Sequence, residues 1–176
     1  MSRDEVSRLL SIDKLDVALL GALTRDARAG VVELSARLGV ARNTVQSRLR
    51  RLEEDGLLIG FRPDLDLERA GIDVVAFVAL EIVQGRLQDV IAELATVPEV
   101  LEVHATTGRE DLLVRVATIT QASLQDLIEQ ILSIPGVSHS STTLALTTPL
   151  TYRVQPLLEK LSRDATWGRS TPSPGD

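Results

Sequence analysis

The sequence predicts an α+β protein in two parts: a helical N-terminal part and a C-terminal part in which strands and helices alternate. Apolar residues recur at helical spacing through the first third of the chain. The segments between residues 74 and 147 then follow the order strand, helix, strand, strand, helix, strand. The chain has 176 residues, 44% of them apolar, which is enough to form a core in one domain or in two small ones.

The first third of the chain contains three predicted helices. Residues 11–13 precede the first helix, and leucines then recur along it at helical spacing. The second helix is short, Glu33–Leu38, and the third covers Arg42–Glu54. Gly39 separates these two, and Gly56 follows the third, as is common just after a helix. The apolar face of the first helix consists of Leu15, Leu19, Leu20 and Leu23.

The apolar segment Leu57–Phe61 predicts a short strand after the third helix, which makes this part of the chain winged-helix-like. Pro63 disfavours a helical conformation at Arg62 and starts a linker. We therefore place a helix-turn-helix domain at 12–62 and a linker at 63–73.

Residues 74–150 are predicted to form a ferredoxin-like β-α-β-β-α-β domain. An internal repeat supports this topology: Pro98-Glu99-Val100 follows one helix, and Pro135-Gly136-Val137 follows the other, 37 residues later. A chance match of so short a motif is the alternative interpretation. The predicted strands are 74–83, 100–106, 112–117 and 137–147, and the predicted helices are 86–95 and 123–132. Residues 162–176 are rich in Ser, Thr, Pro and Gly, and we expect them to be a disordered tail.

The charge is unevenly distributed. The whole chain has a net charge of −6, but residues 1–62 contain 11 Lys and Arg against 9 Asp and Glu, a net charge of +2. The remainder has a net charge of −8. Nucleic-acid binding depends on the local distribution of charge, so the acidic total does not exclude it.

Composition excludes several classes of site. The chain has no cysteine, which rules out disulfides, cysteine metal sites and thiol catalysis. A zinc site would depend on His104, His139 and carboxylates, so we expect neither a metal nor a cofactor. The longest apolar run, Val74–Leu80, is far shorter than the roughly 20 residues that span a bilayer. We expect a soluble cytoplasmic protein without a membrane partner.

The third helix has the composition of a DNA-recognition helix. From Arg42 to Leu52 it contains four arginines and no acidic residue. Polar side chains near its N-terminus are suited to base edges in the major groove, whereas arginines are suited to phosphates or guanine. A solvated basic helix in an ordinary bundle is the alternative. The candidate base-contacting residues are Arg42, Asn43, Thr44, Gln46 and Ser47, and Arg48, Arg50 and Arg51 are candidates for phosphate contacts or, in part, for contacts within the protein.

The chain resembles the Lrp/AsnC family of transcription regulators over residues 12–150. The matching segments are Leu15–Leu23 with Asp26-Ala27-Arg28, Glu33–Val40, Val45, Arg48, Leu52–Leu58 with Gly60-Phe61, Pro98-Glu99-Val100, His104, Thr107-Gly108 with Asp111, and Pro135-Gly136-Val137 with Thr142-Thr143. The resemblance implies a sequence-specific regulator that binds double-stranded DNA. It also implies homodimers, often assembled further into octamers, and a small effector, usually an amino acid, bound between C-terminal domains.

The resemblance places the effector at the loop Gly108-Arg109-Glu110-Asp111, with Thr106 and Thr107 as further lining residues. Backbone N–H groups at Gly108 could bind a carboxylate, and Asp111 could bind an ammonium group. A plain hairpin, in which Asp111 binds its own backbone, is the alternative. Two positions depart from the family pattern. Ala41 stands where a serine usually caps the recognition helix, and Leu112 stands where an aromatic residue often follows the loop.

Two other classes of function are disfavoured by the sequence. An enzyme is disfavoured because the sequence shows no nucleophile–base pair, phosphate loop or metal cluster. A small-molecule-binding module without DNA binding is disfavoured by the basic third helix.

Overall fold

The computed structural model describes residues 12–168. It divides the chain into two compact units. One unit comprises the residues up to Pro63 together with those from Thr151 onward, and the other comprises Asp64–Leu150. We call them the DNA-binding unit and the sensing unit, after the roles that the resemblance to Lrp/AsnC regulators implies. The C-terminal segment thus belongs to the same unit as the N-terminal helices, which the sequence did not predict.

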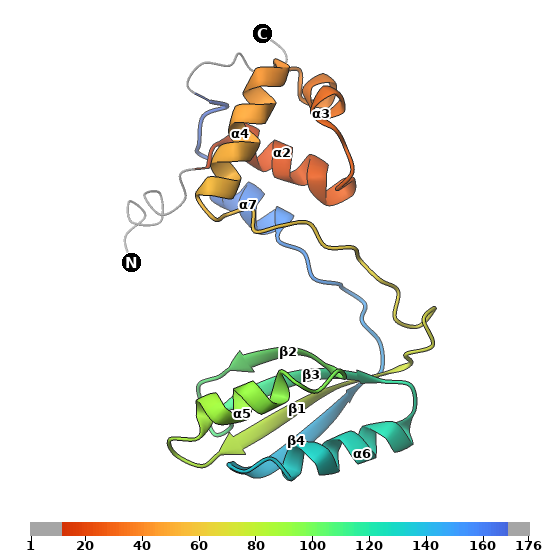
Figure 1. Ribbon diagram of the computed structural model, residues 1–176. Coiled ribbons are helices and arrows are strands. Elements are labelled where there is room, and N and C mark those ends of the chain that lie inside the picture. The colour runs from red at the N-terminus through yellow and green to blue at the C-terminus, as the bar shows by residue number, and fades with distance from the viewer. Residues whose placement is uncertain (1–11, 169–176) are drawn as a thin grey trace. The chain divides into compact units, whose positions relative to one another are not determined.

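The DNA-binding unit is helical within the described residues (Figure 1). Its helices are α2 (Lys14–Arg25), α3 (Val31–Leu38), α4 (Arg42–Glu54) and α7 (Gln155–Leu161). The predicted third helix has the observed bounds, whereas the second begins two residues earlier than predicted. The core of this unit consists of Leu15, Leu19, Ala22, Leu23, Leu34, Leu38, Val40, Val45 and Leu52.

The predicted strand at Leu57–Phe61 is wrong, because these residues follow α4 without strand structure. The Leu58 N–H donates to the Leu52 carbonyl at 2.8 Å, which holds the segment against the end of α4. Ile59 and Phe61 are 87% and 52% exposed. The described part of this unit contains no strand with which the segment could pair, so its apolar composition was not sufficient for a wing.

The sensing unit is a four-stranded antiparallel sheet with two helices. The sheet order is β2-β3-β1-β4, as expected for the β-α-β-β-α-β topology. The elements are β1 (Val74–Ile82), α5 (Leu87–Leu94), β2 (Val100–Ala105), β3 (Leu112–Thr118), α6 (Gln121–Leu132) and β4 (Val137–Ala145).

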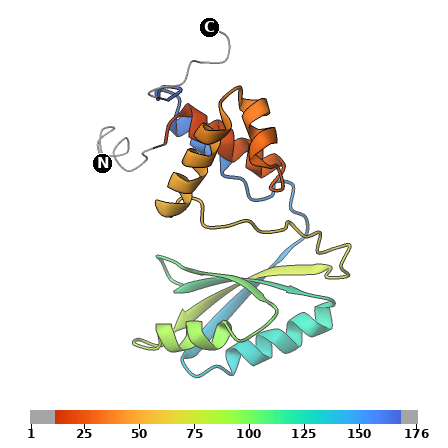
Figure 2. The same cartoon turned by 45° about the horizontal axis from the view of Figure 1, so that its top comes forward.

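Both helices of the sensing unit lie on the same face of its sheet (Figures 1 and 2). Alternate residues of each central strand point toward them, since side chains along a strand alternate between faces. The resulting core is aliphatic. Its fully buried members from the strands are Ala76, Val78, Leu80, Leu112, Val114 and Val116, and those from the helices are Val90, Leu94 and Ile131.

The two Pro-x-Val repeats each lead from a helix into a strand, β2 in the first copy and β4 in the second. Gly136 in the second copy has φ +111°, and a Cβ there would lie 2.8 Å from the Arg86 Cβ. Only glycine therefore fits this turn.

The prediction of a disordered tail at 162–176 is wrong for its described part, residues 162–168. Ser162 is only 5% exposed, and Trp167 packs against the core of the DNA-binding unit. Residues 162–168 thus contact folded structure, and residues 169–176 lie outside the described residues.

Candidate DNA interface and effector loop

The turn between α3 and α4 is fixed by local hydrogen bonds. Gly39 adopts φ +66°, a left-handed conformation that glycine tolerates, and its N–H donates to the Ser35 carbonyl. The Ser35 hydroxyl donates to the Val40 carbonyl at 2.6 Å. Leu34 and Val45 are each 1% exposed, so the two helices pack together on either side of the turn. The arrangement is a helix-turn-helix, in which the second helix presents one face to solvent.

That solvent face of α4 is polar and basic. Asn43, Gln46, Ser47 and Arg50 are all exposed, and they occur at i, i+3, i+4 and i+7, so they lie on one side of the helix. Arg42 is also exposed, and Thr44 is half-buried. Five of the eight candidate DNA-binding residues are thus freely accessible at or beside one surface.

Arg48 and Arg51 point instead toward α2. The Arg48 Nη1 lies 2.5 Å from the Asp13 Oδ2 and 3.1 Å from the Asp16 carboxylate. The Arg51 Nη2 also donates to the Asp16 carboxylate. The Asp16 side chain is fully buried, and the Arg48 side chain is only 16% exposed. We call these four residues the acid–arginine cluster.

This cluster gives Arg48 and Arg51 the contacts within the protein that the sequence left open as one of two alternatives. Their charged groups face the carboxylates of Asp13 and Asp16. Burial lowers the pKa of Arg48, but the hydrogen bond to Asp13 and the charges of Asp16 and Asp13 outweigh it and leave the pKa raised. Arg48 is therefore charged throughout the neutral range, and the cluster fixes α4 against the start of α2.

The same two aspartates form the N-cap of α2. The Asp13 carboxylate accepts the Asp16 N–H at 3.0 Å, and the Asp16 carboxylate accepts the Asp13 N–H at 2.9 Å, which is a capping box. The sequence contains the components of this cluster, two acids three residues apart and two arginines three residues apart, but no local pattern pairs residues more than thirty positions apart. By contrast, Ala41 caps α4 without a side-chain hydrogen bond, as expected.

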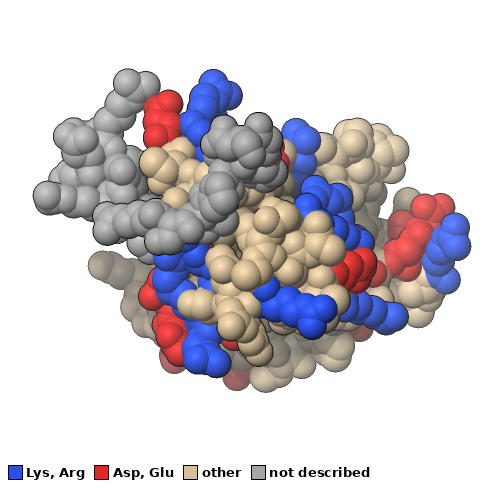
Figure 3. Space-filling model, turned by 90° about the horizontal axis from the view of Figure 1, so that it is seen from above, with Lys and Arg blue, Asp and Glu red and all other residues tan. Residues whose placement is uncertain are grey.

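Acidic side chains lie beside the basic ones on the surface of the DNA-binding unit. Arg37 pairs with Glu33 at 2.7 Å, and both side chains are exposed. Figure 3 shows Lys and Arg in several separate places on the face seen from above, beside Asp and Glu, rather than in one continuous patch. The polar face of α4 is therefore a more specific feature than the net charge of the unit.

The predicted effector loop, residues 106–111, connects β2 and β3 and is largely exposed. The Thr106 hydroxyl donates to the Glu110 carbonyl at 2.6 Å, and the Thr106 N–H donates to the Asp111 carbonyl at 2.9 Å. Gly108 has φ +132°, which favours glycine. These bonds close the hairpin and leave Thr107 and Gly108 at its exposed tip.

Asp111 and Arg109 connect the loop to strand β1. The Asp111 Oδ2 accepts the Ile82 N–H at 2.7 Å, at the point where the β1–β4 register shifts. Arg109 Nε donates to Glu81 Oε1 at 2.8 Å, and this hydrogen bond, with the charges of Glu81 and Glu110, raises the pKa of Arg109. Asp111 binds backbone, as in the hairpin alternative, but the backbone is that of the neighbouring strand. Its other carboxylate oxygen has no hydrogen bond within residues 12–168.

Two shallow cavities, of about 260 and 250 Å³, lie away from this loop. The first is lined by α2, α7 and Trp167, and the second by the ends of α5 and α6. Within residues 12–168 no three His, Asp or Glu side chains are grouped so that they could bind a metal ion. No helix in this range is both long and apolar enough to cross a membrane.

A family model described as the AsnC-type helix-turn-helix domain matches residues 12–53, and one described as the Lrp/AsnC ligand binding domain matches residues 75–155. The chain belongs to the Lrp/AsnC family. Lrp/AsnC proteins are DNA-binding transcription regulators modulated by small molecules, and they are not enzymes.

Individual members of the Lrp/AsnC family match over most of their length. HTH-type transcriptional regulator FL11 of Pyrococcus horikoshii is 33% identical over 137 residues, which cover 78% of this chain and 91% of FL11. The proline dehydrogenase transcriptional activator of Rhizobium radiobacter is 32% identical, and the match covers 77% of this chain and 89% of the activator.

Solved structures of Lrp/AsnC proteins have a similar fold to this chain. The match to E. coli AsnC has a TM-score of 0.77 at 28% identity and covers 84% of this chain and all of AsnC. The match to a Neisseria meningitidis transcriptional regulator, solved as its L-Met complex, has a TM-score of 0.77 at 25% identity. It covers 84% of this chain and 99% of that one.

Proposed function

We propose that this regulator binds specific DNA sequences through the N-terminal half of α4. The observation that carries the proposal is the exposed polar face of that helix, which directly follows the hydrogen-bonded turn between α3 and α4. Side-chain amides and hydroxyls on this face can pair with base edges in the major groove. The proposed base-contacting residues are Arg42, Asn43, Thr44, Gln46 and Ser47, with Arg50 at a phosphate.

The acid–arginine cluster stabilises the position of α4 by joining it to the start of α2. Because Arg48 and Arg51 are neutralised by Asp13 and Asp16, they are not needed for counterion release on DNA binding. Among the four arginines of α4, we therefore assign the phosphate contact to Arg50 and the orienting role to Arg48 and Arg51.

Quantitative DNA binding tests this assignment. Arg50→Ala should weaken binding to all sequences and reduce the slope of log K against log salt by about 0.9. Gln46→Ala should keep that slope and relax the preference at particular base pairs, by about 1–3 kcal/mol each. Arg50→Lys keeps the charge and is the matched control. Unchanged slope and unchanged base preference in both alanine variants would refute the interface.

We also propose that the effector is an amino acid bound at the loop 106–111. The relative from Neisseria meningitidis was solved with L-Met, which has the carboxylate and ammonium groups that this loop suits. In this proposal, backbone N–H groups near Thr107 and Gly108 bind the carboxylate, and the Asp111 oxygen that is not bonded to Ile82 binds the ammonium. The loop is exposed in one chain, so a second chain would complete the site.

The protein is proposed to act as a homodimer, with octamers as a further assembly, in the cytoplasm. The face of the sheet opposite α5 and α6 supports dimerisation. It presents Val75, Phe77 and Ala79 from β1 and Leu113 from β3, and Phe77 is 37% exposed. This apolar strip has Arg115 and Thr143 beside Phe77 on the neighbouring strands, and an exposed strip of this kind is typical of a face that packs against another layer.

Mass measurement and thermal shift test these two proposals separately. Phe77→Glu should convert the oligomer to smaller species. If the Phe77→Glu oligomer had the same mass as the wild-type oligomer, the proposed interface would be refuted. An amino acid present at about 100 times its Kd should stabilise the wild-type protein by about 2.7 kcal/mol. The variant Asp111→Asn should lose this stabilisation, whereas an unchanged shift would exclude Asp111 from the site.

A further inference from the structure

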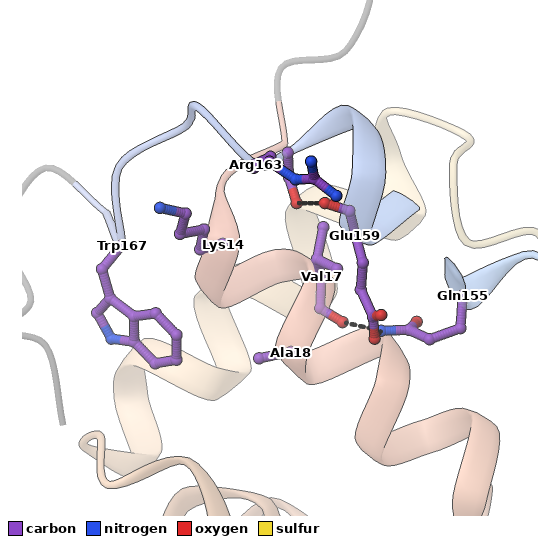
Figure 4. A pocket seen from close by; sticks show the side chains of 8 residues that line it. Lys14, Val17, Ala18, Gln155, Glu159, Arg163 and Trp167 are labelled. Carbon is purple, nitrogen blue, oxygen red and sulfur yellow. Dashed lines mark hydrogen bonds between the residues drawn. The ribbon is translucent and has the colours of Figure 1, made fainter. Parts of the chain in front are cut away.

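The C-terminal segment returns to the DNA-binding unit and packs on α2. Helix α7 begins after Val154, with Pro156 in its first turn, where a missing N–H costs nothing. Leu158 is 9% exposed and Ser162 is 5% exposed, so one side of the helix is buried. Figure 4 shows α7 and Trp167 beside α2, with the shallow cavity of about 260 Å³ between them. We call residues 155–167 the C-terminal anchor.

Specific hydrogen bonds fix the anchor at both of its ends. The Gln155 Nε2 donates to the Val17 carbonyl of α2 at 3.1 Å (Figure 4). At the other end, the Lys14 N–H donates to the Thr166 carbonyl at 3.1 Å. Lys14 is the first residue of α2, so the anchor also occupies one of the free N–H groups of that helix. Trp167 then packs on the core of the unit.

Gly21 provides the space that Gln155 occupies. A Cβ at Gly21 would lie 2.5 Å from the Gln155 Nε2 and 2.9 Å from its Cδ. The amide group would have to move, and its bond to the Val17 carbonyl would be lost. Gly21 is in the middle of α2, where glycine is unfavourable, so its presence fits the packing of Gln155 rather than the helix itself.

The anchor changes how the sensing unit is connected. Val75 of β1 is paired with Ala145 of β4, so the chain enters and leaves the sheet on neighbouring strands. The entering connector comes from α4, and the leaving connector ends in α7 on α2. The family models match 12–53 and 75–155, so nearly all of the anchor lies outside both.

We propose that the C-terminal anchor makes the sensing unit a doubly tethered insertion, which acts on α4 through one connector and on α2 through the other. The acid–arginine cluster joins α2 to α4, so a different displacement of the two helices would change how α4 is presented to DNA. An effector signal would then depend on the docked anchor. This effector step rests on the proposed function, whereas docking of the anchor does not.

Trp167 is the only tryptophan of the chain, so its fluorescence reports docking directly in the full-length protein. The test compares Leu158→Asp, which places a charge in the buried side of α7, with Leu157→Asp on the exposed side, where Leu157 is 54% exposed. Gly21→Ala is a second variant that displaces Gln155 without polar groups in the core. Circular dichroism establishes that each variant is folded.

We expect acrylamide to quench Trp167 weakly in the wild type and in Leu157→Asp, and strongly in Leu158→Asp. Quenching in Gly21→Ala should lie between these values, because only the Gln155 end of the anchor is displaced. DNA affinity is measured with and without a mixture of amino acids. Coupling between sites typically changes Kd by about 5- to 150-fold. In Leu158→Asp this change should fall below about twofold, in Gly21→Ala it should be reduced, and in Leu157→Asp it should keep the wild-type value.

Strong quenching of Trp167 in the wild type would overturn the docking itself. Undocked variants that keep the full effector response would overturn the double tether and leave the anchor a structural element. If wild-type DNA binding responds to no amino acid, the proposed effector fails, while Trp167 quenching still decides whether the anchor docks.

Discussion

Replacement of Arg48 by Ala distinguishes two possible roles of this side chain: stabilising the position of α4, and contacting DNA. The sequence predicts that this change weakens binding to most DNA sequences, as loss of a phosphate contact would. The structure predicts loss of stability instead, because the Arg48 guanidinium binds Asp13 and Asp16. The exposed Arg50, two residues further along the same helix, is the matched control.

The magnitude follows from the burial of the partners. Removal of one member of a buried ion pair costs about 3–5 kcal/mol, because the other charge remains without compensation. Asp16 is fully buried but would keep Arg51 and the Asp13 N–H as donors. We therefore expect a loss of about 2–3 kcal/mol. For a unit of this size, that corresponds to a decrease in Tm of about 10–20 °C.

Urea unfolding followed by Trp167 fluorescence measures this loss, because the single tryptophan lies in the DNA-binding unit. Arg50→Ala should change stability by less than about 0.5 kcal/mol. A cycle with Asp16→Asn should give a coupling energy of about 1–3 kcal/mol. Below Tm, Arg48→Ala should keep the wild-type dependence of DNA binding on salt.

The pH dependence has a definite sign. A raised pKa means that the contribution of Arg48 is fully present below the pKa of the unfolded chain and is lost only as pH rises through the folded value. The stability difference between wild type and variant should thus be constant between about pH 6 and 9. Wild-type stability in Arg48→Ala, together with a reduced salt slope, would refute the reasoning.

Three further variants test the fold and the loop. Gly136→Ala should lower the Tm of the sensing unit, since φ +111° and the 2.8 Å approach to the Arg86 Cβ exclude a side chain; an unchanged calorimetric transition would contradict this. Leu80→Ala should cost about 2–5 kcal/mol, because Leu80 is fully buried between sheet and helices, and urea unfolding followed by far-UV circular dichroism measures it. Asp111→Asn keeps an oxygen for the Ile82 N–H, so the stability of the effector-free protein should be near wild type; a large loss would assign the charge of Asp111 to the fold rather than to the effector.

Local patterns carried the prediction of the secondary structure. The third helix has its predicted bounds, and all four strands of the sensing unit lie within two residues of theirs. Helical and strand periodicities depend on side chains only a few residues apart, so they can be recognised in sequence. The segment 57–61 failed because a strand needs a partner, and no local pattern reports whether one exists.

The candidate DNA interface was likewise predictable only in its local features. Exposure of Asn43, Gln46 and Arg50 follows from the period of a single helix. The partners of Arg48 do not, because Asp13 and Asp16 are more than thirty residues away in sequence. The arginines and their helix were predictable from the sequence. The carboxylates with which Arg48 and Arg51 pair were not.

The sequence by itself determined the two folds, the order of their elements and the polar face of the recognition helix, because each depends on periodicity, turn chemistry and local composition. Only the tertiary structure decided three things: that two arginines of α4 pair with carboxylates at the start of α2, that Asp111 holds the neighbouring strand, and that the C-terminal segment belongs to the N-terminal unit. Each of these is a contact between residues distant in sequence, and such contacts depend on how the elements pack together.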